Sequence, residues 1–227
     1  TDGLMCQPPT SQCPTVRLVL AISLDGRLAP PEGGAAQLGG EGDRCALEQA
    51  LAWADACLIG AGTLRAHQCT CLIRNPQLLK QRLQEGRSQQ PAAVVVSRSL
   101  GFSSTWRFFD QPLQRWLLAP APMHQGFDRW FPLAPTWPER LKALGAAGIQ
   151  RLVLLGGAQL AADLLRADCV DALQLTVVPQ LLGGPFSWLP LTDSPLPASL
   201  VQPGAWQSDG VEDLGHGEWL LRYQRIR

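Results

Sequence analysis

The sequence carries no excess of charge of either sign. Its 227 residues include 19 lysines and arginines against 19 aspartates and glutamates, so the formal net charge is zero at neutral pH. Proteins that bind nucleic acid or anionic membranes through their overall field need an excess of positive charge. The balance therefore argues against nucleic acid and membrane as partners and favours a small molecule.

Long apolar runs are missing as well. A membrane helix needs about 18 to 20 consecutive apolar residues, and no stretch of this chain provides them. Residues 1–15, which include Pro8, Pro9 and Pro14, lack the charged and apolar regions of a signal peptide. We therefore predict a cytoplasmic protein. Its seven cysteines, an odd number, are scattered among apolar stretches, so we expect reduced thiols and no structural disulfide.

The composition indicates one large domain. A hydrophobic content of 46% is enough for a single core, and no shift in composition marks a second domain. Residues 1–15 are rich in Pro, Thr, Ser and Gln and have little apolar surface to bury, so we predict a disordered leader. Residues 16–227 are predicted to form the domain.

Short apolar runs alternate with segments of helical periodicity along most of the chain. The apolar runs predict strands at residues 16–22, 56–59, 92–96, 116–119 and 151–155. The periodic segments predict helices from Asp43, as the N-cap, to Trp53, at residues 76–87 and 138–147, and after Gly156-Gly157 to about residue 167. This alternation is typical of an α/β fold with a mostly parallel central sheet that helices cover on both faces.

The end of the chain follows a different pattern. Strands predicted at residues 172–178, near 201–208 and at 218–224 follow one another without intervening helices. We therefore expect antiparallel strands to complete the sheet. Residues 30–42 contain two prolines and several glycines and predict a long loop.

Two of the predicted strands end in glycines and lead into a helix. One is Leu58-Ile-Gly-Ala-Gly-Thr63, which offers Gly60, Gly62 and Thr63, and the other is Leu154-Leu-Gly-Gly-Ala-Gln159, which offers Gly156 and Gly157. The carboxyl ends of parallel strands meet at one edge of a sheet, where open α/β sheets bind ligands. The free N–H groups of a helix start suit a pyrophosphate. The alternative is a pair of tight turns without a ligand.

A third strand end bears on the choice of cofactor. Neither glycine motif is G-x-G-x-x-G, and no acidic residue follows at the distance that would bind a ribose 2′-hydroxyl, so a Rossmann site is not expected. The strand at 92–96 leads into Ser97, Arg98 and Ser99, whose donors suit a 2′-phosphate. This favours NADPH over NADH. The chain has neither a G-x-S-x-G elbow nor a Ser-His-Asp order, so nothing supports a hydrolase.

Five ordered motifs give the chain a family likeness over residues 16–225. They are Ser23-Leu-Asp-Gly-Arg27, Gly60-Ala-Gly-Thr-Leu64, Gly156-Gly157, Val170-Asp-Ala-Leu173 and Val178-Pro-Gln-Leu-Leu-Gly183. In this order the chain resembles the reductase domain of riboflavin biosynthesis. The resemblance implies a dihydrofolate-reductase-like fold, a homodimer, and NADPH-dependent reduction of the ribosylamino group of a pyrimidinedione phosphate to ribitylamino.

The resemblance also implies which residues hold the cofactor. These are Ala21, Thr63, Ser97, Gly157, Ala158, Gln159 and Leu160. Many members carry a zinc-dependent deaminase domain ahead of the reductase, built on H-x-E and P-C-x-x-C. Neither pattern occurs in this chain, so the resemblance implies the reduction step alone.

The departures from the family concentrate on the substrate side. The family usually has a lysine where this chain has Val19, and an acidic residue where it has Leu155. A Ser-x-Trp of the family aligns with Ala36 and Leu38. Arg74 matches a substrate-side position. Two further readings therefore stay open, which are a dihydrofolate-reductase-like oxidoreductase with a different small substrate and a non-catalytic nucleotide-binding homologue.

The segment after the first glycine motif departs too, because His67, Gln68 and Cys69 stand where the family has Asp-Asp-Pro. With a reference pKa of about 6.5, His67 could act as the proton donor near neutral pH, or it is a polar loop residue. The alternate spacing of His67, Cys69 and Cys71 is not that of a zinc site, so no metal is expected. Asp25 is predicted to belong to a turn with Gly26, with a substrate contact as the alternative.

Overall fold

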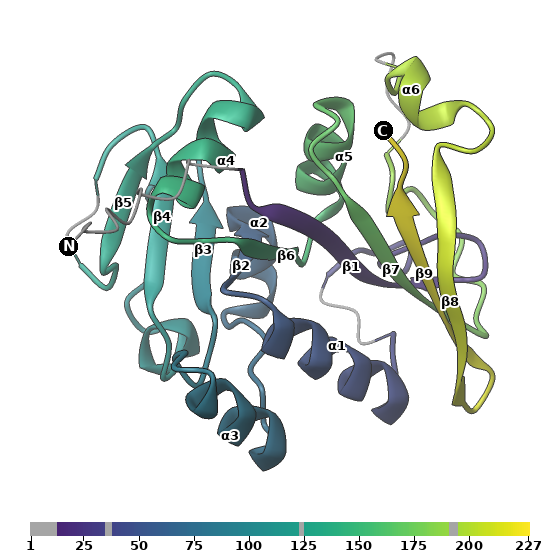
Figure 1. Ribbon diagram of the computed structural model, residues 1–227, viewed down its shortest axis with the longest axis horizontal. Coiled ribbons are helices and arrows are strands. Elements are labelled where there is room, and N and C mark those ends of the chain that lie inside the picture. Colours follow the sequence, from purple (N-terminus) through teal and green to yellow (C-terminus); the bar gives the residue numbers. More distant parts are fainter. Residues whose placement is uncertain (1–12, 35–37, 123–124, 191–194) are drawn as a thin grey trace, which may run out of the picture.

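Nine strands form one sheet in the computed structural model, which describes residues 13–34, 38–122, 125–190 and 195–227 (Figure 1). Their order is β5-β4-β3-β2-β6-β1-β7-β9-β8. The run from β5 to β7 is parallel throughout, whereas β9 pairs antiparallel with β7 and β8 pairs antiparallel with β9. The strands are β1 (Thr15–Ser23), β2 (Ala56–Gly60), β3 (Ala92–Val96), β4 (Arg115–Ala119), β5 (Arg129–Pro132), β6 (Arg151–Leu154), β7 (Ala172–Val178), β8 (Trp206–Gly215) and β9 (Glu218–Arg225).

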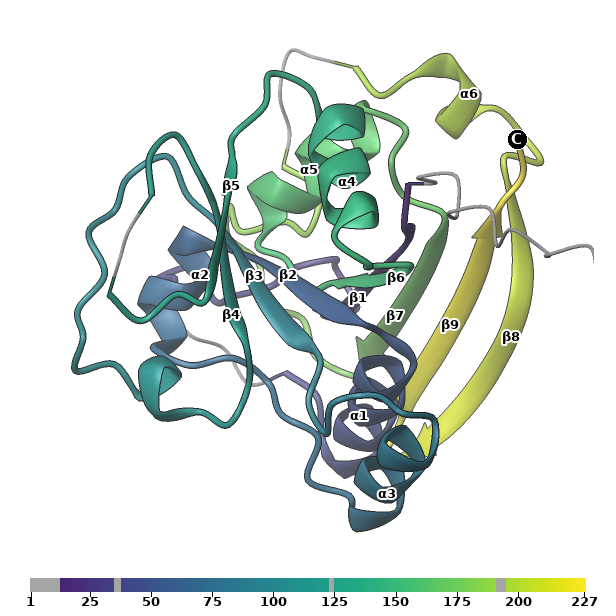
Figure 2. The ribbon, with the colours of Figure 1, turned by 60° about the vertical axis from the view of Figure 1, so that its left-hand side comes forward.

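Helices cover both faces of the parallel part of the sheet (Figure 2). Side chains alternate along a strand, so neighbouring residues of β1 enter different clusters. Leu18 packs with residues of α4 (Trp137–Ala146) and α5 (Ala158–Arg166). Val19 packs with Ala50 of α1 (Glu41–Trp53) on the opposite face, which we call the α1 face. The remaining helical segments are α2 (Ala61–His67), α3 (Pro76–Gln84), the 3-10 turn η1 (Arg107–Asp110) and α6 (Ala198–Val201).

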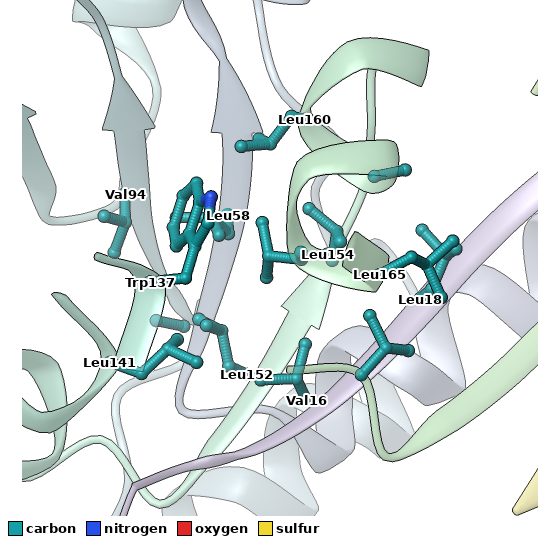
Figure 3. Close-up of a cluster of buried hydrophobic side chains, with 14 of the residues drawn as sticks. Val16, Leu18, Leu58, Val94, Trp137, Leu141, Leu152, Leu154, Leu160 and Leu165 are labelled. Atoms are coloured by element: carbon teal, nitrogen blue, oxygen red, sulfur yellow. The ribbon is translucent and has the colours of Figure 1, made fainter. Parts of the chain in front are cut away.

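The larger core lies between the sheet and the helices α4 and α5. Figure 3 shows apolar side chains of β1, β2, β3 and β6 that meet Trp137 and Leu141 of α4 and Leu160 and Leu165 of α5. Leu58, Leu152 and Leu154 have no exposed surface. This core fixes the start of α5 relative to the ends of β6 and β1.

The predicted α/β class with a mostly parallel sheet and antiparallel C-terminal strands is confirmed. The strands predicted at 92–96 and 172–178 match β3 and β7 residue for residue. β7 itself is parallel to β1, so the antiparallel part is formed by β9 and β8. The chain from Thr15 onward is part of the sheet, and residues 1–12 of the predicted leader lie outside the described residues.

Three boundaries were predicted wrongly. Helix α1 begins at Glu41 with Gly40 as its N-cap, so Asp43 lies inside the first turn, because the Gly40 N–H donates to Glu218 Oε1 at 2.8 Å. Helix α3 ends at Gln84, since Gly86 takes a positive φ of 71° and closes the helix onto Leu83. The strand expected near 201–208 is β8 at 206–215.

The short strand β5 was missed, because it lies at the sheet edge and most of it is exposed. None of the helices in the described ranges is long and apolar enough to span a membrane. Six cysteines are described and all six are free thiols.

Candidate active site

The two glycine motifs lie side by side at the carboxyl edge of the sheet. β6 lies between β2 and β1, so the chain leaving β2 at Gly60 meets the chain leaving β6 at Gly156. The Gly60 N–H donates to the Gly156 carbonyl at 3.1 Å. We call residues 60–63 together with residues 156–160 the glycine edge. Each glycine motif was recognisable by itself in the sequence, and the parallel sheet brings the two motifs together.

The turn at Gly156-Gly157 requires glycine at its first position and leaves little room for a side chain at its second. Gly156 has a φ of 90°, which other residues rarely adopt, and its peptide bond to Gly157 is cis. A Cβ on Gly157 would lie 3.0 Å from the Thr63 Oγ1, tighter than most protein contacts. Gly156 itself is buried, whereas the backbone of Gly157 is partly exposed and within reach of a ligand.

Helix α5 begins directly after this turn. Ala161 is the first residue whose N–H bonds back into the helix, to the Gly157 carbonyl at 3.0 Å. The N–H groups of Ala158, Gln159 and Leu160 are therefore the free donors of the first turn. Leu160 is buried in the core, so only its backbone is available, and the Gln159 side chain donates to Asp163 at 2.9 Å. The predicted contacts here are backbone donors at a positive helix end, an arrangement that suits a pyrophosphate.

Helix α2 forms the other wall of the glycine edge. It starts after Gly60, and Gly62 lies exposed in its first turn. A Cβ on Gly62 would have no neighbouring atom within 4 Å. Gly62 therefore has no packing reason to be glycine, and open space lies beside it.

The end of β3 carries polar groups next to β2, as predicted. Ser97 is buried, its hydroxyl donates to the Ser99 carbonyl, and it accepts the Ser99 N–H at 3.2 Å. The Arg98 side chain is exposed. Arg65, which the sequence analysis missed, reaches over from α2 and donates from Nη2 to Ser99 Oγ at 2.8 Å, with its guanidinium 5.5 Å from the Phe102 ring centroid. Its position two residues after Thr63 in the helix that follows the first glycine motif was the signal available.

Asp25 binds the backbone of a neighbouring loop. Its carboxylate accepts the Ser23 hydroxyl at 2.5 Å and the N–H groups of Leu182 at 3.1 Å and Gly183 at 2.8 Å. These hydrogen bonds, that from Ser23 first, hold the pKa of Asp25 well below its usual range. The carboxylate thus braces the loop after β1 against the loop after β7, and its contact with substrate stays a prediction.

The two other predicted substrate-side residues stand at helix ends. His67 is exposed in the last turn of α2, about 6 Å along the helix axis from Thr63 and on the end away from Gly157. Arg74 is exposed just before α3, and its backbone N–H donates to Glu48 Oε2 at 2.9 Å. The roles of both residues stay predictions. Ala36 lies outside the described residues.

The two usually charged positions of the family belong to one apolar cluster here. Val19 and Leu155 pack in the same cluster on the α1 face, with Ala50, Ala54 and Val153. Since both positions are apolar together, neither leaves an unpaired charge in the core.

Two cavities in the described part of the chain lie away from this edge. One of about 380 Å³ lies between β5 and α4, and one of about 260 Å³ lies beside Asp55, Arg82 and Arg87. Neither is lined by a residue of the predicted site. Among the residues that the structure describes, no three His, Cys, Asp or Glu side chains are grouped to hold a metal ion.

Comparison with known proteins gives a match to one family model over most of the chain. The model of the RibD C-terminal domain matches residues 14–215. The chain belongs to this family.

Its relatives are named for riboflavin biosynthesis. The chain is 28% identical over 211 residues to the riboflavin biosynthesis protein RibD of Haemophilus influenzae, covering 89% of this chain and 56% of that protein. The chain thus spans about half the length of the bacterial relatives it matches. It is 24% identical over 181 residues to the 2,5-diamino-6-ribosylamino-4(3H)-pyrimidinone 5′-phosphate reductase of Archaeoglobus fulgidus, covering 75% of this chain and 83% of that one.

Solved structures share the fold. A deaminase/reductase of Thermotoga maritima, described as a diaminohydroxyphosphoribosylaminopyrimidine deaminase and 5-amino-6-(5-phosphoribosylamino)uracil reductase, aligns with a TM-score of 0.76 at 18% identity, over 94% of this chain and 57% of that one. The dihydrofolate reductase of Enterococcus faecalis, complexed with NADP(H), aligns with a TM-score of 0.57 at 12% identity, over 94% and 97% of the two chains. The dihydrofolate-reductase-like fold predicted from the motifs is therefore confirmed.

Proposed function

We propose that this chain is an NADPH-dependent reductase that converts the ribosylamino group of a pyrimidinedione phosphate to ribitylamino. One observation carries the proposal, namely that the free N–H groups at the start of α5 and the open glycine of α2, Gly62, meet at one edge of the sheet. The Archaeoglobus fulgidus relative, most of whose length the chain covers, is named as a reductase of this substrate class.

The residues at the glycine edge fit a dinucleotide cofactor. The N–H groups of Ala158, Gln159 and Leu160 would bind the pyrophosphate, and a side chain at Gly62 or Gly157 would take up the space beside them. Bound NADPH supplies the hydride. Ala21, whose strand lies next to β6, would contact the nicotinamide end, so the protein's part is to hold the substrate carbon against it and exclude water.

The polar group at the end of β3 would select the phosphorylated cofactor. Arg65 and Arg98 can place two guanidinium groups beside Ser97 and Ser99. A 2′-phosphate pairs well with such donors, whereas a 2′-hydroxyl gains little from them. Arg65 already donates to Ser99, so its side chain is oriented before a ligand arrives.

The apolar pair Val19 and Leu155 favours a second candidate, a reductase of the same fold with a different small substrate. Both positions usually carry charge in the family, and here both are apolar and pack in one cluster. Purified chain mixed with NADPH and the ribosylamino substrate decides between the two. Loss of the NADPH absorbance is expected. Cofactor binding without oxidation by this substrate would favour the second candidate, or a non-catalytic nucleotide-binding homologue if other carbonyl or imine substrates also fail.

We also propose a homodimer, as the family resemblance implies. Support comes from the face of β8 and β9 opposite α1, where Val211 and Trp219 are 57% and 47% exposed and Leu221 lies between them. Exposed apolar residues on one sheet face suit burial against a second copy. Light scattering on a sizing column should give twice the chain mass, and Val211→Asp should halve it. A monomeric wild-type chain would remove the proposal. The cytoplasmic location stays a prediction.

A further inference from the structure

The segment between α2 and α3, residues 68–75, includes the predicted substrate-side residue Arg74. Ile73 of this segment packs in one cluster with Leu51 of α1, and Leu155 packs against that cluster. The segment therefore lies on the α1 face, beside one of the two positions where the family usually carries charge. It follows directly on α2, the helix that begins at the glycine edge.

Side chains, and not a neighbouring strand, bind the backbone of this segment. The Thr70 N–H donates to Gln111 Oε1 at 2.9 Å, and Gln111 Nε2 donates back to the Thr70 carbonyl at 2.8 Å. The Ile73 N–H donates to Gln90 Oε1 at 2.9 Å, and Gln90 Nε2 donates back to the Ile73 carbonyl at 2.8 Å. Each amide thus exchanges two hydrogen bonds with its partner, as a residue of an antiparallel strand does. We call residues 68–75 the clamped loop.

Glu48 of α1 holds the end of the clamped loop. Its Oε2 accepts the N–H groups of Arg74 at 2.9 Å and Asn75 at 2.8 Å. Glu48, Gln90 and Gln111 are each only 8% exposed. Hydrogen bonds that form away from solvent are strong and costly to break. The three side chains come from separate parts of the chain and together fix the path of the loop.

The clamped residues and their neighbours differ in burial. Thr70 and Ile73 are buried, whereas Cys71 and Arg74 are exposed. The hydrogen bonds that hold the loop join its backbone to side chains from outside the loop. The loop can therefore exchange its exposed side chains without changing its shape.

We propose that Glu48, Gln90 and Gln111 are positioning residues of the substrate side, which hold the clamped loop in the conformation that binds substrate. This rests on the proposed reductase function. Ordering a free loop would consume binding free energy, because fixing each residue costs conformational entropy. A loop that is fixed before the substrate arrives leaves that free energy for binding. The three residues act through the loop backbone and make no contact with the reacting atoms.

Gln111→Met and Gln90→Met test the proposal, because methionine fills a similar volume and removes both hydrogen bonds of the amide. The KM for the ribosylamino substrate should rise by about tenfold or more in each variant, while kcat stays within about threefold. The NADPH dissociation constant, measured by quenching of tryptophan fluorescence, should stay within about twofold, because the glycine edge is unchanged. Gln89→Met, at an exposed glutamine next to Gln90, is the matched control and should keep all three values. Thermal unfolding checks that the variants fold.

Amide hydrogen exchange measures the clamp without the reaction. The N–H groups of Thr70 and Ile73 should exchange slowly in the wild-type chain. Gln111→Met should speed the exchange at Thr70, while Val94 in the buried strand β3 keeps its protection. Fast exchange of Thr70 and Ile73 in the wild-type chain would overturn the proposal, and this outcome needs no variant that folds.

The kinetic outcomes separate positioning from general support of the fold. An unchanged KM in both variants, or an equal weakening of NADPH and substrate binding, would overturn the positioning role. If the wild-type chain reduces no substrate, the proposed function falls and the positioning role with it. An active wild type whose two variants keep its KM removes the positioning role alone.

Discussion

The glycine edge and the α1 face lie on neighbouring strands, but backbone groups form the first and side chains form the second. The glycine edge works through backbone: four glycines, a helix start and three free N–H groups. The α1 face works through side chains, namely Val19, Ala50, Ala54, Val153 and Leu155. A backbone site tolerates change in most residues around it, whereas a side-chain site changes with each substitution. This explains why the chain keeps the family's glycine motifs while its substrate side diverges.

The sharpest test of this contrast is Gly157→Val. The added methyl groups would crowd Thr63 Oγ1, which already lies 3.0 Å from a Cβ at this position, and would cover the start of α5. NADPH affinity should fall by about two orders of magnitude or more, in a chain that still unfolds cooperatively on heating. Loss of folding together with binding would leave the turn a purely structural feature, and binding that survives would refute the cofactor site.

Gly62→Ala is the matched change, because no protein atom lies within 4 Å of the added methyl group. Alanine inside α2 should stabilise the helix by up to about 1 kcal/mol. A weaker NADPH complex in this more stable variant would place the cofactor against α2, and unchanged affinity would show that nothing lies there.

Selectivity between NADPH and NADH should depend on side chains even at the glycine edge. Arg65→Ala and Arg98→Ala should each narrow the preference for NADPH by about 1 to 3 kcal/mol if their guanidinium groups meet the 2′-phosphate. Arg65, already bonded to Ser99, should have the larger effect. Fluorescence titrations with NADPH and with NADH measure this preference in the wild type and in each variant. Equal affinity of the wild-type chain for NADPH and NADH would contradict the assignment of this strand end.

The smallest effect is expected for Asp25→Asn, on the thermal stability of the chain, and this effect should depend on pH. The pKa of Asp25 is lower in the folded chain than its unfolded value of about 3.9, so its contribution to stability is present above that value and is lost as pH falls below it. Asp25→Asn should therefore lower the melting temperature at pH 7, and the difference from wild type should shrink as pH falls below about 3.9 and be lost only below the folded-state pKa of Asp25. A difference that stays constant with pH would show that the charge is not what braces the two loops.

The sequence predicted best those elements whose physics is local. β3 is a continuous apolar run, and β7 is rich in aliphatic and β-branched residues around Gln174 and Thr176, so both were marked to the residue. β5 and β8 were missed or misplaced because edge strands are exposed and lack that pattern. The glycine motifs were visible for the same reason as β3, because each is a pattern of consecutive residues.

Contacts between distant segments could not be predicted in this way. Arg65 meets Ser99 across two strand ends, and the Gly40 N–H donates to the Glu218 carboxylate from the far end of the chain. Asp43 was predicted as the N-cap where Gly40 stands, because the Glu218 partner of Gly40 is distant in sequence. Side-chain sites of this kind depend on the fold as a whole.

The apolar contact between Val19 and Leu155 also constrains how this chain can evolve. Val19→Lys alone would place an ammonium group among Ala50, Ala54 and Val153, which are almost fully buried, at a cost of about 3 to 5 kcal/mol. That is a large fraction of the free energy of unfolding of a typical domain. Leu155 is only partly buried, so an acidic residue there stays in reach of solvent and costs less. A path back to the common family pattern is therefore ordered, with the acidic residue acquired before the lysine.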